Sequence, residues 1–192
     1  MRAYRVVLSL LVLCLASCGP ILGQAMRATE GIRSFEVTEG HLGDLPTGVQ
    51  LLVFGPFAKT DAAFYICRGE DAADFALALR DADLFRTELY LERDYDRLEA
   101  TVRGLREKTP PQLQAALGLT APPDLLLFGT LLHRSMIVAP TRGVITDVGY
   151  RLEFFDPGTR RSVTVEIAAK EPFERAVTEI TRELAERRAR AP

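Results

Sequence analysis

Two cysteines four positions apart, Cys14 and Cys18, are the residues near the start of the chain best suited to chemistry. Closely spaced thiolates could be half of a metal site. Their surroundings indicate something else. Arg2 and Arg5 precede a largely apolar run, Val6–Ala16, and small residues follow it, which is the pattern of a secretory signal peptide. The run is shorter than the roughly 20 apolar residues that cross a bilayer as a helix.

The segment Leu15-Ala16-Ser17-Cys18 resembles the bacterial lipobox, in which a peptidase cuts just before a cysteine that already carries a diacylglycerol thioether. The resemblance implies that residues 1–17 are a lipoprotein signal peptide, that Leu15, Ala16 and Ser17 are recognised by the peptidase, and that Cys18 becomes the acylated first residue. Cys14 is then discarded and cannot share a metal with Cys18. An ordinary secretory signal and an uncleaved anchor helix are the alternatives.

The acyl chains on Cys18, palmitate among them, would hold the protein on a membrane, because each buried methylene contributes about 0.8 kcal/mol. Gly19, rather than Asp, follows the cysteine, which resembles the outer-membrane sorting pattern of two-membrane bacteria. We therefore expect an outer-membrane anchor with the body in the periplasm, or a cell-membrane anchor in a single-membrane bacterium. Residues 18–32 show no periodicity and are expected to be a flexible tether.

Charge and length bound the class of the mature protein. Removal of residues 1–17 leaves 175 residues, enough for one domain with a substantial core. The remaining 22 Lys and Arg against 26 Asp and Glu give a formal net charge of −4. Nucleic-acid binders concentrate positive charge on one face, so this balance gives no reason to expect a nucleic-acid partner.

Residues for nucleophilic or metal-assisted catalysis are few. The serines beyond residue 17 are Ser34, Ser135 and Ser162, and none lies in a G-x-S-x-G turn. The only histidines, His41 and His133, are far apart, and no spacing supports a zinc site that joins them to a cysteine. His133-Arg134-Ser135 is the best remaining catalytic candidate, although polar residues at a strand end explain it more simply.

Two further motifs have a simple structural explanation. Cys67 follows Phe64-Tyr65-Ile66 and is expected to be buried and inert. Asp81-x-Asp83 is similar to the metal–nucleotide motif of glycosyltransferases, but no nucleotide-binding half accompanies it, and a helix end accounts for it. No G-x-x-x-x-G-K-S/T phosphate loop occurs. We therefore expect no catalytic residue, no metal and no cofactor.

Hydrophobic periodicity predicts the elements that would position any site. Strands are expected at 33–38, 49–54 and 87–91, as one long strand or two broken strands at 124–138, and as a hairpin of 150–155 and 163–167 around Asp156-Pro157-Gly158-Thr159. Helices are expected at 70–82, 95–105 and 110–117. A terminal helix opens at Pro172 with Phe173, Val177, Ile180 and Leu184 on a buried stripe. Residues 62–67 are either another strand or an irregular lead-in.

This order of elements predicts an α+β fold. We expect an α/β sandwich with a mixed, largely antiparallel sheet and helices packed mainly on one face. Residues 33–192 are expected to form a single α/β domain.

Several short motifs give the chain a family resemblance. Gly55-Pro56-Phe57 follows the first apolar strand, Asp83-Leu84-Phe85 ends the first helix, Pro123–Leu131 opens the central strand, and Phe155–Thr159 forms the hairpin turn. Over roughly residues 48–186 this pattern resembles the periplasmic lipoprotein superfamily that includes CsgG, LpoB, PelC and the N-terminal domain of TolB.

The resemblance implies an α/β sandwich without catalytic activity, which binds partners or self-assembles in envelope assembly, secretion or polymer export. The expected partners are the membrane, through acylated Cys18, and an envelope protein or further copies of the chain. Two other functions stay open. One is a periplasmic hydrolase or modifying enzyme of unrecognised type, and the other is an auxiliary lipoprotein of an ABC exporter.

Overall fold

The central strands of the sheet are apolar on both faces, and this decides how the layers are built. β2 (Gln50–Lys59) contains the run Leu51–Phe54, and β4 (Leu125–Ala139) begins with Leu125–Phe128. All eight side chains are buried. Because successive side chains of a strand point to opposite faces, such runs need a cover on each side.

The computed structural model describes residues 30–63, 70–139 and 143–191. Leu15, Ala16, Ser17, Cys18 and Cys67 lie outside these ranges, as does most of the segment 62–67. Residues 32–192 group together as one unit by their contacts.

Six strands form one mixed sheet in the order β1-β6-β5-β4-β2-β3. β2 runs parallel to both of its neighbours, β3 and β4, whereas β4, β5 and β6 are antiparallel. The predicted α+β fold with a mixed, largely antiparallel sheet is confirmed. The other strands are β1 (Gly31–Glu39), β3 (Arg86–Leu91), β5 (Gly143–Asp156) and β6 (Arg161–Pro172).

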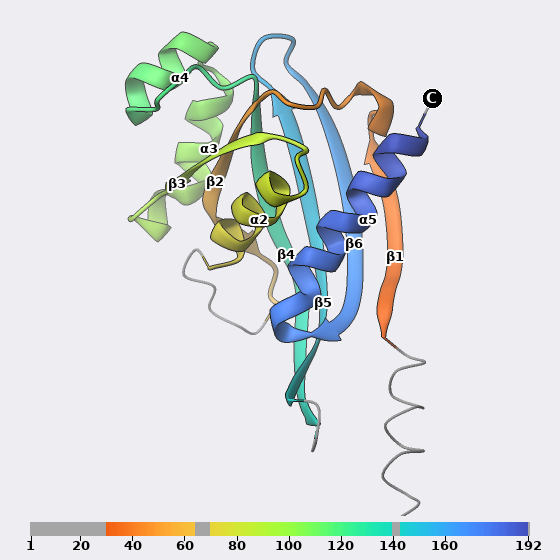
Figure 1. Cartoon of the computed structure of the whole chain (residues 1–192). Helices are drawn as coiled ribbons and strands as arrows, with labels where there is room; N and C mark the ends of the chain where they lie inside the picture. Colours follow the sequence, from red (N-terminus) through yellow and green to blue (C-terminus); the bar gives the residue numbers. More distant parts are fainter. Residues whose placement is uncertain (1–29, 64–69, 140–142, 192) are drawn as a thin grey trace, which may run out of the picture. The chain divides into compact units, whose positions relative to one another are not determined.

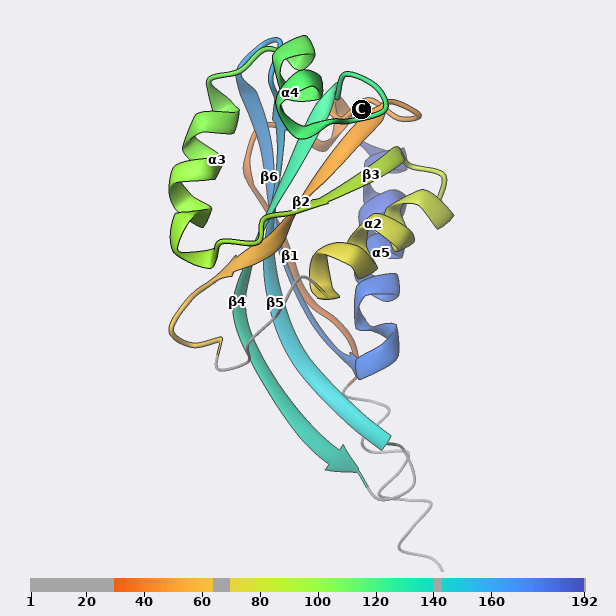
Figure 2. The same cartoon turned by 90° about the vertical axis from the view of Figure 1, so that its left-hand side faces the viewer.

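Helices cover both faces of this sheet (Figures 1 and 2). α2 (Glu70–Asp81) and α5 (Ala176–Arg190) lie on one face over the larger core, which contains Leu51 and Val53. The shorter α3 (Leu98–Arg106) and α4 (Pro110–Leu117) lie on the other, over a smaller core that contains Leu52 and Phe54. The helical cover is therefore unequal, with the longer pair on one face. Short 3-10 turns occur at η1 (Leu42–Asp44), η2 (Tyr95–Arg97) and η3 (Phe173–Arg175).

The short helix α4 shows how local sequence sets an element. Pro110 stands at its first turn, and Thr109 forms a capping box with Gln112. The Thr109 amide donates a hydrogen bond to the Gln112 Oε1 at 2.9 Å, so groups that a helix start leaves unpaired are satisfied. The predicted helix at 110–117 is confirmed.

β5 is longer than expected, because it starts at Gly143 rather than near residue 150. The alternation of Tyr150, Leu152 and Phe154 extends back to Val148, with Asp147 and Gly149 between apolar residues, and it is broken before that by Thr146 and Ile145. In the structure Gly149 pairs with His133 of β4, and a Cβ there would lie 2.4 Å from the His133 ring. The glycine therefore makes room for the imidazole across the two strands.

The expectation that Phe173 lies on the buried stripe of the terminal helix is wrong. Its side chain is 43% exposed, because it lies in the η3 turn before α5, where 3-10 geometry shifts it out of phase with the helix. Ala176, Ile180 and Leu184 form the buried stripe instead, and Val177 is partly buried.

A buried ion pair joins α2 to the sheet. Arg134 of β4 donates a hydrogen bond to the Asp71 carboxylate, and their side chains are only 5% and 7% exposed. The Tyr150 hydroxyl of β5 donates to the same carboxylate oxygen at 2.6 Å. A charge removed from water at this depth is tolerated only when it is paired, so the three residues fix the start of α2 over β4 and β5.

Replacing Asp71 by Ala is expected to lower the unfolding free energy by about 3–5 kcal/mol, because the buried Arg134 guanidinium loses its ion pair with this carboxylate and the Tyr150 hydroxyl loses its hydrogen bond to it. The double variant Asp71→Leu with Arg134→Met should lose less. Urea unfolding followed by circular dichroism measures both. Arg80→Ala on the same helix removes an exposed pair with Asp81 and is the control, with a change of about 0.5 kcal/mol or less. A double variant as unstable as the single one would contradict this account.

Candidate functional site

The residues predicted to carry the lipid anchor, Cys18 with Leu15, Ala16 and Ser17, lie outside the described residues. Lipidation of Cys18 therefore stays a prediction from the sequence.

The segment His133-Arg134-Ser135 does not form a catalytic arrangement. Arg134 is used by the buried pair with Asp71, and the His133 Nε2 lies 3.3 Å from the Asp147 carboxylate. No hydrogen bond joins His133 to Ser135 in the part of the chain that the structure describes. The Arg134 side chain joins β4 to α2, and the His133 side chain contacts β5.

The other candidates also lie apart. Asp81 ends α2 in an exposed pair with Arg80, and Asp83 has a φ of 54°, which marks a turn after a helix. Ser162 donates a hydrogen bond to Glu153 at 2.7 Å. Within residues 30–63, 70–139 and 143–191, no group of three or more His, Cys, Asp or Glu side chains could hold a metal ion. No helix of the same residues is long and apolar enough to span a membrane.

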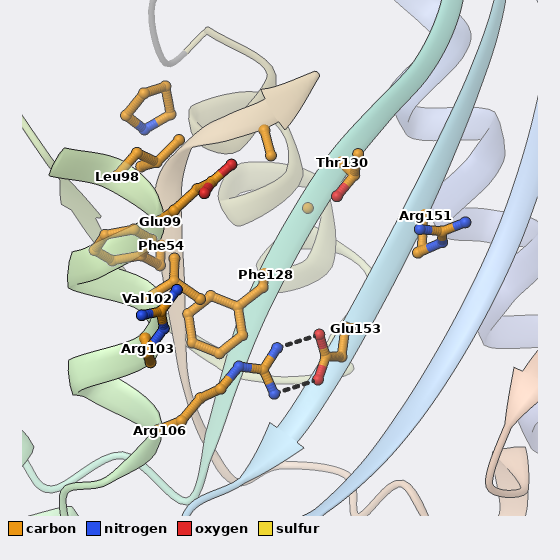
Figure 3. A pocket seen from close by; sticks show the side chains of 13 residues that line it. Phe54, Leu98, Glu99, Val102, Arg103, Arg106, Phe128, Thr130, Arg151 and Glu153 are labelled. Atoms are coloured by element: carbon orange, nitrogen blue, oxygen red, sulfur yellow. Dashed lines mark hydrogen bonds and ion pairs between the residues drawn. The ribbon is translucent and has the colours of Figure 1, made fainter. Parts of the chain in front are cut away.

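The structure reveals a cleft between α3 and the sheet that sequence reasoning did not find (Figure 3). It encloses about 420 Å³. Its apolar side chains include Phe54 of β2, Leu98 and Val102 of α3, and Phe128 of β4. Charged side chains line it as well, and these are Glu99, Arg103, Arg106, Arg151 and Glu153.

The strongest polar contact in the cleft is a two-pronged pair between Arg106 and Glu153. The Arg106 Nη1 donates to the Glu153 Oε1 at 2.7 Å, and Nη2 donates to the other oxygen. The guanidinium also lies 4.9 Å and 5.1 Å from the ring centres of Phe128 and Phe155. The two N–H groups of the Arg106 guanidinium bind the carboxylate, and its flat face lies against the two aromatic rings. This one side chain therefore holds α3 against β5.

Burial favours the neutral form of Glu153, but the hydrogen bonds from Arg106 and Ser162, with the charges of Arg106 and Arg151, outweigh it. The pKa of Glu153 is therefore lowered from its ordinary value of 4.5. A carboxyl that works as a general acid near neutral pH needs a raised pKa instead. Glu153 is thus suited to hold Arg106 and poorly suited to donate a proton.

The remaining charges lie nearer to solvent. Arg151 pairs with Glu166 at 2.8 Å, outside the apolar part of the cleft. Arg103 and Glu99 are exposed, four residues apart on α3, and neither makes an ion pair within the described residues. The cleft therefore combines an apolar interior with one cation, Arg103, that a bound molecule could contact without breaking an existing pair.

Comparisons with known proteins give distant structural matches alone. No family model matches the chain, and no curated protein does. Among solved structures, the chain is similar to a single-residue variant of the PelC dodecamer from Paraburkholderia phytofirmans, with 13% identity and a TM-score of 0.45, over 80% of this chain and 93% of that chain.

Two further structures are similar to a comparable degree. A second crystal form of the PelC dodecamer matches with 13% identity and a TM-score of 0.42, over 80% of this chain and 92% of that one. A hypothetical protein from Chlamydia trachomatis matches with 12% identity and a TM-score of 0.39, over 73% and 95%. PelC is one of the superfamily members that the sequence motifs resemble, but similarity at this level supports no inference about what this chain does.

Replacing Glu153 by Gln is expected to lower the unfolding free energy at pH 7 by roughly 1 kcal/mol, which is below the range of about 1.5–3 kcal/mol for a hydrogen bond to a charged group because the pair is partly exposed. Since the folded-state pKa is depressed, this stability is fully present above the ordinary value of 4.5 and is lost as the pH falls through the folded-state value. The difference from wild type should therefore shrink between pH 7 and pH 3 in urea unfolding. Arg106→Leu should lose the same pH-dependent part of the unfolding free energy. If the difference in unfolding free energy between wild type and Glu153→Gln does not change with pH, the pairing of Glu153 with Arg106 is refuted as its cause.

Proposed function

We propose that the chain is a lipid-anchored, non-catalytic protein of the outer membrane, with its body in the periplasm. It works by binding an envelope protein or further copies of itself in envelope assembly, secretion or polymer export. The observation that carries the proposal is the segment Leu15–Cys18 directly after the apolar run Val6–Ala16. That order of residues is the one a lipoprotein-processing pathway requires, and a cytosolic protein has no use for it.

The cleft supports binding over catalysis. Among the residues that the structure describes, no Ser, His or Cys side chain lines it, and the carboxylates of this lining are those of Glu99 and Glu153. Arg106 holds the pKa of Glu153 below its ordinary value, so this carboxyl is ionised and is poorly suited to act as a general acid. An apolar interior with a few fixed polar groups is what a recognition site for a peptide segment or small molecule needs.

The family motifs also have structural and not chemical roles in this fold. Gly55 lies where α2 and β3 approach β2 most closely, because a Cβ there would lie 2.5 Å from the Ala72 Cβ. Leu84 and Phe85 are buried in the larger core. Asp156 accepts hydrogen bonds from the amides of Gly158 and Thr159 at 2.7 and 3.0 Å and closes the β5–β6 turn. These residues maintain the fold, in agreement with a non-catalytic function.

Two alternative functions lead to different observations. A periplasmic hydrolase or modifying enzyme would lose turnover of a substrate when Glu99 or Glu153 is replaced by Gln at constant protein level. An auxiliary lipoprotein of an ABC exporter would crosslink to a transporter subunit of the inner membrane. An assembly lipoprotein would instead crosslink to an outer-membrane or periplasmic protein, or to itself.

Cys18→Ala is expected to abolish acylation and release the protein from the membrane fraction. The thioether forms on the cysteine that ends the lipobox, and this variant has no cysteine at that position. Intact mass and fractionation measure the two effects. Cys14→Ala is the matched control, since Cys14 is removed with the leader, and it should leave mass and location unchanged. An unmodified, soluble wild-type protein would overturn the proposed anchoring.

Arg103→Glu is expected to weaken partner or self-crosslinking in the membrane fraction, because it reverses the one cation of the cleft that is outside an ion pair in the described structure. Ala100→Glu on the same helix faces away from the cleft lining and is the control. Chemical crosslinking followed by mass spectrometry of the membrane fraction gives the readout. Equal crosslinking in both variants would exclude the cleft as the contact surface.

A further inference from the structure

Exposed apolar side chains gather at one end of the sheet. Nine large apolar side chains of the described residues are exposed, and five of them lie where β4 ends, β5 begins and β6 passes into η3. We call this set the apolar end, and it consists of Met136, Ile137, Val138, Val144 and Phe173. Val138 is the most exposed, at 79%, and Ile137 follows at 52%.

The strand pairing explains why these side chains are not covered. The pairing of β2 with β4 stops at Lys59 and Leu131, so from His133 onward the described sheet gives β4 only β5 as a neighbour. Ser135, Met136, Ile137 and Val138 are four consecutive exposed residues. Because alternate side chains point to opposite faces, Met136 and Val138 extend from one face of β4 and Ile137 from the other. A flat protein surface can cover only one face of this part of β4, whereas the acyl chains of a lipid membrane can surround both faces.

The apolar end also lies where the chain enters the body. In both views β1 begins at the end of the sheet toward which β4 and β5 extend (Figures 1 and 2). A hydrogen bond agrees, because Thr38 near the end of β1 donates to the Thr164 carbonyl near the start of β6, so β1 starts toward the other end of β6, where Pro172 pairs with Ile145. Cys18 precedes β1 by 13 positions, which reach at most about 45 Å when fully extended.

We propose that the apolar end inserts into the headgroup–acyl boundary of the membrane that carries the acyl anchor, so that the body is held in one orientation. This inference rests on the proposed acylation of Cys18. Once Cys18 is in the bilayer, the short tether keeps the apolar end at a high effective concentration near the same lipid surface, and a weak apolar contact is then sufficient.

The test uses the full, acylated protein in phosphatidylethanolamine–phosphatidylglycerol vesicles, in a Cys67→Ser background so that one thiol can be labelled. Val138→Cys carries an environment-sensitive fluorophore, and Val144→Cys, its cross-strand partner, provides a second reporter. Thr159→Cys, in the β5–β6 turn at the other end of β5, is the matched control. Both reporter sites are exposed, so labelling should not disturb the core.

We expect blue-shifted emission at residues 138 and 144, quenching by nitroxide-labelled lipid, and protection from aqueous iodide. Residue 159 should show none of these. If the protein is acylated and floats with the vesicles but all three probes stay open to iodide, the lipid contact is refuted and the proposed anchoring stands. Protection that depends on protein concentration, without lipid quenching, would show that a second copy covers the apolar end and would also refute it. Missing acyl mass and loss of flotation would overturn the anchoring, and the inference with it.

Discussion

Burial of β2 and β4 on both faces is the constraint on which the rest of the structure depends. Leu51 and Val53 point into the core under α2 and α5, and Leu52 and Phe54 point into the core under α3 and α4. Neither strand could be stable with one face in water, so the sheet needs two helical layers. The buried pair of Asp71 and Arg134 then fixes how α2 sits on the sheet, because an unpaired charge at that depth is strongly disfavoured.

The cleft follows from the unequal size of the two layers. The long helices α2 and α5 cover their face more completely, whereas α3 and α4 have 9 and 8 residues and cover the other face only in part. The gap beside Phe54 and Phe128 is bridged at one point by Arg106 and Glu153. Among its charged side chains, Arg106 and Glu153 pair with each other and Arg151 pairs with Glu166, whereas Glu99 and Arg103 are exposed and make no ion pair within the described residues.

The apolar end and the cleft lie on different parts of the described body. The apolar end lies at the end of the sheet where β1 starts. The cleft lies on the face of the sheet under α3. A body oriented by a second membrane contact would present this cleft in a constant direction to a periplasmic partner or to neighbouring copies, and orientation lowers the entropy lost on association.

The sequence by itself determined the features that depend on neighbouring residues. The helix start at Thr109-Pro110, the turn at Asp156 and the period of the helices and most strands are all local, and they sufficed for the α+β fold class. Acylation of Cys18 is likewise a prediction from the sequence alone.

The tertiary structure decided the rest. Arg106 and Glu153 are 47 positions apart, and no local pattern joins them. The start of β5 at Gly143 depends on pairing with β4, and the exposure of Val138 depends on where β2 stops. Pairing between distant strands sets which side chains meet and which remain in water, and a local pattern of residues carries no information about that choice.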